Sequence, residues 1–186
     1  RAHFVNSTTI LCPSPGGWTE ADRVILQVTW NGVDYDNNQF QYSFYSIQKA
    51  HPRSGPSNGK GGDIIIHGQG FREDTQPLCQ LNDTNYEPLS VSPTQIRCPM
   101  PAAEGGDEYF GNVGFAVTAN GITWNPFDGG FQYYQQPMVE DIDPKTGPST
   151  GLGIINFYGQ GFRSDYPLAE LSCRVGKATG KAYFVS

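Results

Sequence analysis

The sequence contains no long apolar run and no basic cluster. No stretch approaches the roughly 20 apolar residues that a membrane-spanning helix needs, and the segment Arg1–Phe4 does not have the apolar core of a signal peptide. Lys and Arg number 12 against 18 Asp and Glu, which gives a formal net charge of -6. Nucleic-acid binding depends on many Lys and Arg contacts to phosphates. We therefore expect neither a nucleic-acid partner nor a membrane-inserted segment in these residues.

The common catalytic motifs are missing as well. The sequence has no Gly-x-Ser-x-Gly elbow, no His-Glu-x-x-His pair and no phosphate-binding loop. We therefore expect a chain that is not an enzyme and that needs no cofactor.

Cysteines are few, and none has the Cys-x-x-Cys spacing of zinc sites and redox pairs. They are Cys12, Cys79, Cys98 and Cys173. Disulfides are the interpretation we favour. Asn6 and Asn82 each begin an Asn-x-Thr acceptor, so we expect N-glycans on both. Together these features predict an extracellular protein, secreted or on the cell surface, in an oxidising compartment.

What the sequence does contain is turn formers and aromatic residues. Its 23 Gly and 14 Pro are spread along the chain, which is typical of turns between many short strands. Its 11 Phe, 10 Tyr and 3 Trp supply much of the area that a core can bury. No helical periodicity of useful length is present. The composition favours an all-β fold.

An internal repeat organises the chain. A Gly-Pro turn, a β-branched run and the sequence Gly-Gln-Gly-Phe-Arg occur within residues 54–72 and return within residues 146–163. The offset is about 91 residues, which is the size of one immunoglobulin-like sandwich.

Two further blocks repeat at a similar distance. Residues 5–15 match residues 91–101, so that Cys12 and Cys98 coincide, and Val28–Gly32 matches Val117–Gly121. The repeat therefore extends over several separate elements.

Within the repeat the local pattern is that of strands. Apolar side chains recur at period two in four segments, residues 24–28, 40–44, 113–117 and 131–133. The dipeptides Asn31-Gly32 and Asn120-Gly121 predict type I′ hairpin turns, which need positive φ at both residues.

These ordered blocks resemble the IPT/TIG domain, an immunoglobulin-like fold. The resemblance implies tandem β-sandwiches and covers nearly the whole chain. Such domains occur in plexin and Met-type receptor ectodomains, in transcription factors and in some polysaccharide-active enzymes, so the resemblance predicts the fold more closely than the function.

The order of the blocks predicts one whole domain and two halves. Residues 1–45 resemble the C-terminal half of a domain, residues 46–136 a complete one and residues 137–186 the N-terminal half of a further one. Residues 181–186 also resemble residues 1–6, as expected for one period of a longer array.

The resemblance implies how the cysteines pair. Cys79 and Cys98 would form a disulfide within the complete domain. Cys12 and Cys173 stand at the positions of Cys98 and Cys79 in the two halves, so we expect an inter-unit disulfide from Cys173 to the next Cys12.

Other candidate sites have stronger structural explanations. Two histidines, His67 and His3, fall where another copy of the repeat has tyrosine, which excludes a catalytic histidine shared by the repeats. Two acidic clusters offer oxygen ligands to calcium, but they lie where a turn and a domain junction are expected; they are Asp34–Asn38 and Asp141–Asp143. Three tryptophans offer rings for sugar stacking and are also typical core residues; they are Trp18, Trp30 and Trp124.

The function predicted from these features is structural. We expect a repeat unit of an extracellular glycosylated filament or stalk, joined head to tail with copies of itself or adjacent repeats by completing split domains. The alternative is a ligand-binding or adhesive ectodomain of a cell-surface receptor or adhesin, and a third possibility is an accessory module of a polysaccharide-degrading enzyme.

Overall fold

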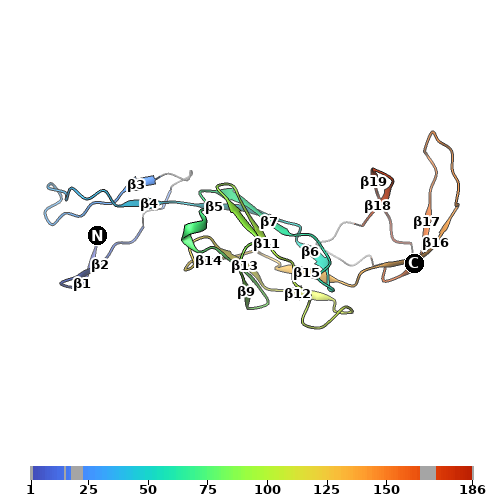
Figure 1. Cartoon of the computed structure of the whole chain (residues 1–186), viewed down its shortest axis with the longest axis horizontal. Coiled ribbons are helices and arrows are strands. Elements are labelled where there is room, and N and C mark those ends of the chain that lie inside the picture. The colour runs from blue at the N-terminus through green and yellow to red at the C-terminus, as the bar shows by residue number, and fades with distance from the viewer. Residues whose placement is uncertain (1, 15, 18–22, 164–170, 186) are drawn as a thin grey trace.

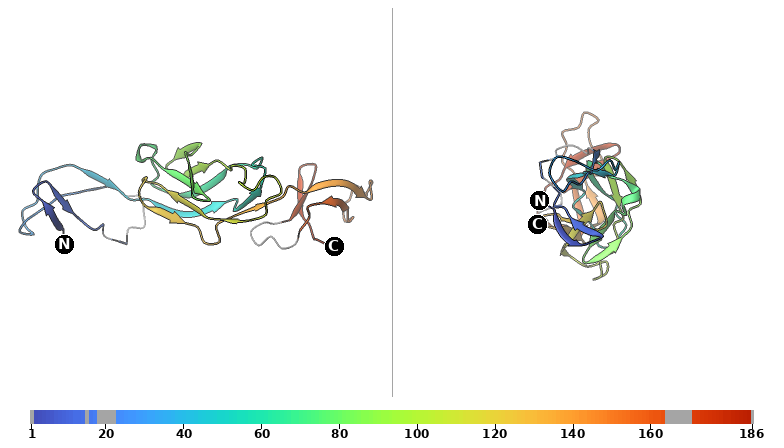
Figure 2. Two further views of the ribbon diagram at one scale, coloured as in Figure 1. Left: turned by 90° about the horizontal axis from the view of Figure 1, so that it is seen from below. Right: turned by 90° about the vertical axis from the view of Figure 1, so that its left-hand side faces the viewer.

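The computed structural model describes residues 2–14, 16–17, 23–163 and 171–185. Among these residues the regular elements are β-strands and one turn of 3-10 helix, η1 (Glu73–Thr75). The chain is drawn out along one axis, with a central domain between two end segments (Figures 1 and 2). In the described part of the chain, no helix has the length and hydrophobicity to cross a bilayer.

The central domain is a β-sandwich of eleven strands. In chain order they are β5 (Ser46–His51), β6 (Ser54–Pro56), β7 (Ile64–Gln69), β8 (Leu78–Leu81), β9 (Thr84–Tyr86), β10 (Ser90–Ser92), β11 (Gln95–Cys98), β12 (Gly111–Val113), β13 (Phe115–Thr118), β14 (Trp124–Pro126) and β15 (Phe131–Tyr134). One four-stranded sheet has the order β10-β11-β7-β5 and another the order β14-β13-β8-β9, while β12-β15-β6 form a three-stranded sheet. Pairing is antiparallel except between β15 and β6, which are parallel.

The core lies between these sheets and follows the period-two pattern of the strands. Ile64 and Ile66 of β7 are 0% exposed, whereas Ile65 and His67 between and beyond them are only half-buried. Aromatic rings fill much of the interior, because Phe131 packs edge-to-face against both Phe115 and Tyr133. A disulfide between Cys79 of β8 and Cys98 of β11 joins the two four-stranded sheets.

The end segments consist of separate two-stranded hairpins. The N-terminal segment contains β1 (His3–Asn6) paired with β2 (Thr9–Leu11), and β3 (Arg23–Ile25) paired with β4 (Gln41–Ser43). The C-terminal segment contains β16 (Met138–Asp143) paired with β17 (Asn156–Gln160), and β18 (Ser172–Val175) paired with β19 (Ala178–Lys181). These hairpins are the elements on which the candidate site depends.

The repeat seen in the sequence is also a repeat of backbone geometry. β16 pairs with β17 in the same register as β5 with β7, including a bulge at the same place. A Cβ on Gly68 would lie 2.1 Å from the Ser46 carbonyl oxygen, and one on Gly159 would lie 1.9 Å from the Met138 carbonyl oxygen. Both glycines are therefore needed because the facing strand approaches closely at the bulge.

The expected type I′ turns at Asn31-Gly32 and Asn120-Gly121 are wrong. Only the glycines have positive φ, 75° and 70°. The Asn31 side-chain oxygen accepts hydrogen bonds from the Val33 and Asp34 N–H groups, and Asn120 is bonded in the same way two and three residues on. Side-chain capping of this kind competes with the tight turn and opens a longer loop.

Candidate functional site

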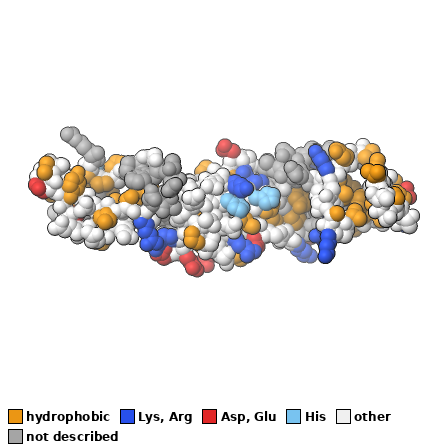
Figure 3. Space-filling model, turned by 90° about the horizontal axis from the view of Figure 1, so that it is seen from above, with side chains coloured by type: hydrophobic (Ala, Val, Ile, Leu, Met, Phe, Trp, Pro, Cys, Tyr) orange, Lys and Arg blue, Asp and Glu red, His pale blue; other side chains and the backbone are white. Residues whose placement is uncertain are grey.

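Exposed apolar side chains gather on the two end segments. None of the described residues in 1–45 or 137–186 is buried, and the space-filling view shows hydrophobic side chains on the surface of both segments (Figure 3). Phe40 is 72% exposed, Leu11 58% and Val175 57%. Large apolar patches on a protein surface mark places where another surface binds.

The central domain contains buried counterparts of some of these exposed side chains. Ile66 of β7 lies opposite Ile96 of β11, and both are 0% exposed. The repeat places Phe157 of β17 and Ile10 of β2 at these two positions, with 37% and 36% of their surface exposed. β17 and β2 belong to opposite end segments, so the equivalent strand pair is not formed within the chain.

A second strand pair of the central domain is likewise missing at the ends. Val117 of β13 lies opposite Cys79 of β8 and is 0% exposed. Its counterpart in the repeat, Val28, is 41% exposed, and the counterpart of Cys79 is Cys173 on β18. By the repeat, β16, β17, β18 and β19 are the counterparts of β5, β7, β8 and β9, whereas β1, β2, β3 and β4 are the counterparts of β10, β11, β12 and β15. The two end segments therefore contain different parts of the repeat.

The cysteines follow the same division. Cys79 and Cys98 have Cα atoms 5.9 Å apart and are fully buried in the core. Cys12 lies one residue beyond β2 and is exposed, and Cys173 on β18 is half-buried. Both are free thiols in the chain.

The two glycosylation acceptors lie on hairpins and are exposed. The Asn6 side-chain oxygen accepts hydrogen bonds from the N–H and the hydroxyl of Thr8, each 2.9 Å long. Asn82 begins the turn between β8 and β9, where it and Asp83 have φ values of 47° and 64°. This turn, and not the Asn-Gly pairs, has positive φ at two consecutive non-glycine residues.

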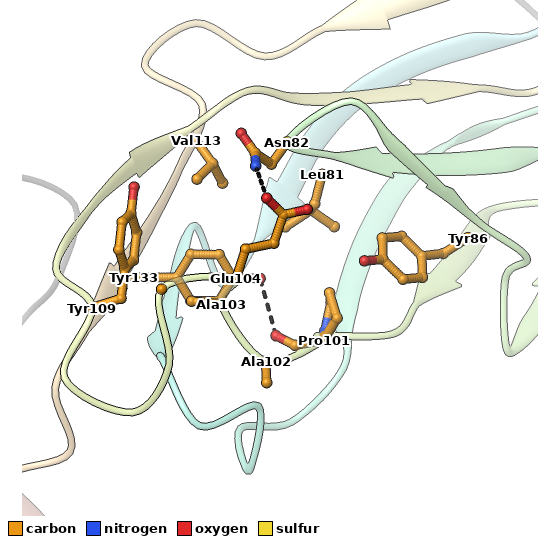
Figure 4. A pocket seen from close by; sticks show the side chains of 11 residues that line it. Leu81, Asn82, Tyr86, Pro101, Ala102, Ala103, Glu104, Tyr109, Val113 and Tyr133 are labelled. Atoms are coloured by element: carbon orange, nitrogen blue, oxygen red, sulfur yellow. Dashed lines mark hydrogen bonds between the residues drawn. The ribbon is translucent and has the colours of Figure 1, made fainter.

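A small cavity opens beside Asn82, with a volume of about 110 Å³. Its aromatic walls are Tyr86, Tyr109 and Tyr133, and Glu104 also lines it, with its carboxylate accepting a hydrogen bond of 3.0 Å from the Asn82 Nδ2 (Figure 4). The Tyr133 hydroxyl donates to the Pro101 carbonyl, and burial raises the pKa of Tyr133 to about 12. Sequence analysis missed this cavity because Glu104 is 22 residues from Asn82.

The remaining candidates lie apart from one another. His3 and His51 are exposed, and His67 is half-buried on β7. Asp141 forms an ion pair with Lys145, which holds the pKa of that carboxyl below its usual value. Across the described residues, no group of three His, Cys, Asp or Glu side chains is placed to hold a metal ion.

The two tryptophans within the described residues differ in exposure. Trp30 is 90% exposed at the loop that follows Thr29, and Trp124 is half-buried on β14. Trp18 lies outside the described residues. Neither of the described tryptophans lines the cavity beside Asn82.

Comparison with known proteins identifies the central domain. Residues 46–133 match the family model of the IPT/TIG domain. A solved structure of the full extracellular region of plexin A4, domains 1 to 10, is similar with 21% identity and a TM-score of 0.44, over 56% of this chain and 9% of that chain. No curated protein matched the chain significantly. The central part of this chain is therefore an IPT/TIG domain with an immunoglobulin-like β-sandwich fold.

Proposed function

We propose that this chain is a non-catalytic structural repeat unit of an extracellular filament or stalk, assembled end to end by completing split immunoglobulin-like domains. The C-terminal segment of one unit packs against the N-terminal segment of the next, and Cys173 of the first forms a disulfide with Cys12 of the second. The partner half is supplied either by an adjacent repeat of a longer polypeptide or by a second copy of the chain.

The observation that carries this proposal is the match between buried and exposed counterparts. Ile66 and Ile96 form a buried pair on neighbouring strands. Their counterparts Phe157 and Ile10 are partly exposed and lie in opposite end segments of the chain, so they do not pair with each other. Unpaired strand edges with an apolar face are prone to pair with a complementary edge. Because each unit offers different halves at its two ends, the contact is head-to-tail and extends without closing.

The setting is inferred from covalent chemistry. A buried disulfide such as Cys79–Cys98 is typical of oxidising compartments, and N-glycans on Asn6 and Asn82 would be added along the same route. We therefore place the protein outside the cell, with no nucleic-acid partner.

The disulfide can be tested with two single variants. Cys12→Ser and Cys173→Ser are each expected to give no disulfide-linked chains alone, because each retains only one thiol of the proposed pair. An equimolar mixture should give a dimer on a non-reducing gel, and its cross-linked peptide should join Cys173 to Cys12. The unaltered chain should give a ladder. Cross-links that join Cys12 to Cys12 or Cys173 to Cys173, or a mixture that stays monomeric, contradict the proposal.

The polypeptide version needs a tandem protein, in which residue 180 of one copy is followed by residue 1 of a second. Its middle sandwich is expected to close with an internal Cys173–Cys12 disulfide and to bury Phe40 of the second copy. Imaging of the native material then separates the two functions, since an array gives uniform fibres and an adhesin gives short rods with distinct heads.

A further inference from the structure

The cavity beside Asn82 is placed where a sugar on that residue would emerge. Asn82 is held in the turn by its own N–H, which donates to the Gly114 carbonyl at 3.0 Å. Its side-chain nitrogen points to Glu104, which lines the cavity (Figure 4). A substituent on Nδ2 therefore begins beside residues that line the cavity.

We propose that this cavity binds the first N-acetylglucosamine of an N-glycan on Asn82. The inference rests on the proposed glycosylation, which is a transfer from a polyprenyl-diphosphate-linked oligosaccharide. The Asn82 Nδ2 forms a bond to the sugar C1, the bond from C1 to the diphosphate oxygen breaks, and the amide gives up one proton. The other amide hydrogen remains and can still donate to Glu104.

The lining of the cavity suits an acetylated amino sugar. Tyr86 and Tyr109 are half-buried and present ring surface, on which the apolar face of a pyranose or an acetamido methyl packs. The Glu104 carboxylate has several acceptor positions, of which Asn82 occupies one, so that sugar N–H and O–H groups have an acceptor within the site.

Two other positions show that this arrangement is specific to Asn82. Gly176 stands at the same turn position of the β18–β19 hairpin, with φ 61°, and the sequence there has no acceptor. Asn6 does have an acceptor sequence, but its side-chain oxygen bonds to Thr8 and it does not line the cavity beside Asn82. Asn6 therefore serves as an internal control.

The first test is release of the glycans from the native protein by a glycoamidase. The sugar on Asn82 is expected to be released at least tenfold more slowly than the sugar on Asn6, and equally fast after denaturation. Glu104→Ala, a change at an exposed loop residue, should raise the rate at Asn82 and leave the rate at Asn6 unchanged. Equal native rates at the two sites overturn the proposal.

The second test measures thermal stability. An endoglycosidase that leaves a single N-acetylglucosamine should leave the Tm of the glycoprotein unchanged, because the sugar bound in the cavity remains. Thr84→Ala, which removes the acceptor, should lower the Tm by about 4 °C relative to Thr84→Ser, which keeps it. In the Tyr86→Ala background this difference in Tm between the two Thr84 variants should disappear. If it persists there, the sugar is not bound in the cavity.

The outcomes are distinguishable from those of end-to-end assembly. If mass spectrometry finds an unmodified Asn82 peptide, both the glycosylation and the binding of the sugar in the cavity are overturned. If Asn82 is modified but its glycan is released as fast as that on Asn6, only the binding in the cavity is overturned. The Cys173–Cys12 cross-link is read from other peptides, so assembly stands or fails separately.

Discussion

Phe131 is 0% exposed on β15, whereas Phe40, its counterpart about 91 residues earlier, is 72% exposed beside β4. The same side chain in the same repeat position is thus a core residue in one place and a surface residue in the other. Phe131→Ala should lower the free energy of unfolding of the central domain by about 3–5 kcal/mol, because it removes the centre of the aromatic cluster. Denaturant unfolding of the isolated chain measures this.

Phe40→Ala is the matched change, and in the isolated chain it should alter the stability by less than about 0.5 kcal/mol. In the disulfide-linked assembly or the tandem protein the same change should cost about as much as Phe131→Ala. A Phe40→Ala chain that loses stability without assembly would mean that residue 40 already packs within the monomer.

The Cys79–Cys98 disulfide closes a loop with a sequence separation of 19 residues. Replacing both cysteines with Ala should lower the unfolding free energy by about 3 kcal/mol, since the unfolded chain gains the entropy of the open loop. Urea titration of the two forms provides the value. Unchanged stability would indicate that the bridge is not formed in the protein as purified.

Alkaline pH should destabilise the central domain through Tyr133. Burial raises the pKa of Tyr133 in the folded state to about 12 from the ordinary value of 10, so the protonated phenol is favoured by folding. This contribution is fully present below pH 10 and is lost as the pH rises through about 12. The unfolding free energy of the parent chain should fall over that range.

The control for this dependence is Tyr133→Phe. It should weaken the domain by about 1 kcal/mol at neutral pH, through loss of the hydrogen bond to Pro101, and should flatten the alkaline decline. Equal declines in both proteins would assign the effect to other tyrosines, such as Tyr134, whose pKa burial also raises.

Close strand approach at the β5–β7 bulge should make Gly68 intolerant of a side chain. Gly68→Ala places a methyl group 2.1 Å from the Ser46 carbonyl oxygen and should cost about 1–3 kcal/mol. Gly62→Ala, where a methyl group meets nothing within 4 Å, is expected to be nearly neutral. Thermal denaturation of the pair would show whether the bulge is as rigid as the geometry requires.

The sequence predicted the fold well because repeated, spaced features determined it. Period-two apolar positions such as Phe115 and Val117 predicted the strand that is β13, where both side chains are buried, and the central IPT/TIG domain is confirmed by the family match over residues 46–133. The Asn-Gly turns were mispredicted because the Asn31 and Asn120 side chains bond to the following N–H groups, a competition that dipeptide preferences do not capture.

The cavity beside Asn82 could not be predicted in the same way. Asn82, Glu104 and Tyr133 are far apart in the sequence, and they meet only because β15 and the loop after β11 converge on the β8–β9 turn. Residues that share no periodic pattern leave no local signal. The acceptor sequence at Asn82 was readable, but what lies next to it was not.

The parallel pairing of β6 with β15 has a mechanical consequence. The chain enters the central domain at β5, which directly precedes β6 in the sequence, and leaves it after β15, and the end segments lie on opposite sides (Figure 1). Tension along the long axis pulls β6 and β15 past each other lengthwise. The hydrogen bonds between them, including Gln132 N–H to the Arg53 carbonyl and Ser57 N–H to the Tyr134 carbonyl, are then loaded together in shear. The Arg53 side chain adds bonds to the Gly130 and Asp128 carbonyls just before β15. These hydrogen bonds must therefore break together before the central domain can be extended, so the β6–β15 pairing resists stretching of the unit.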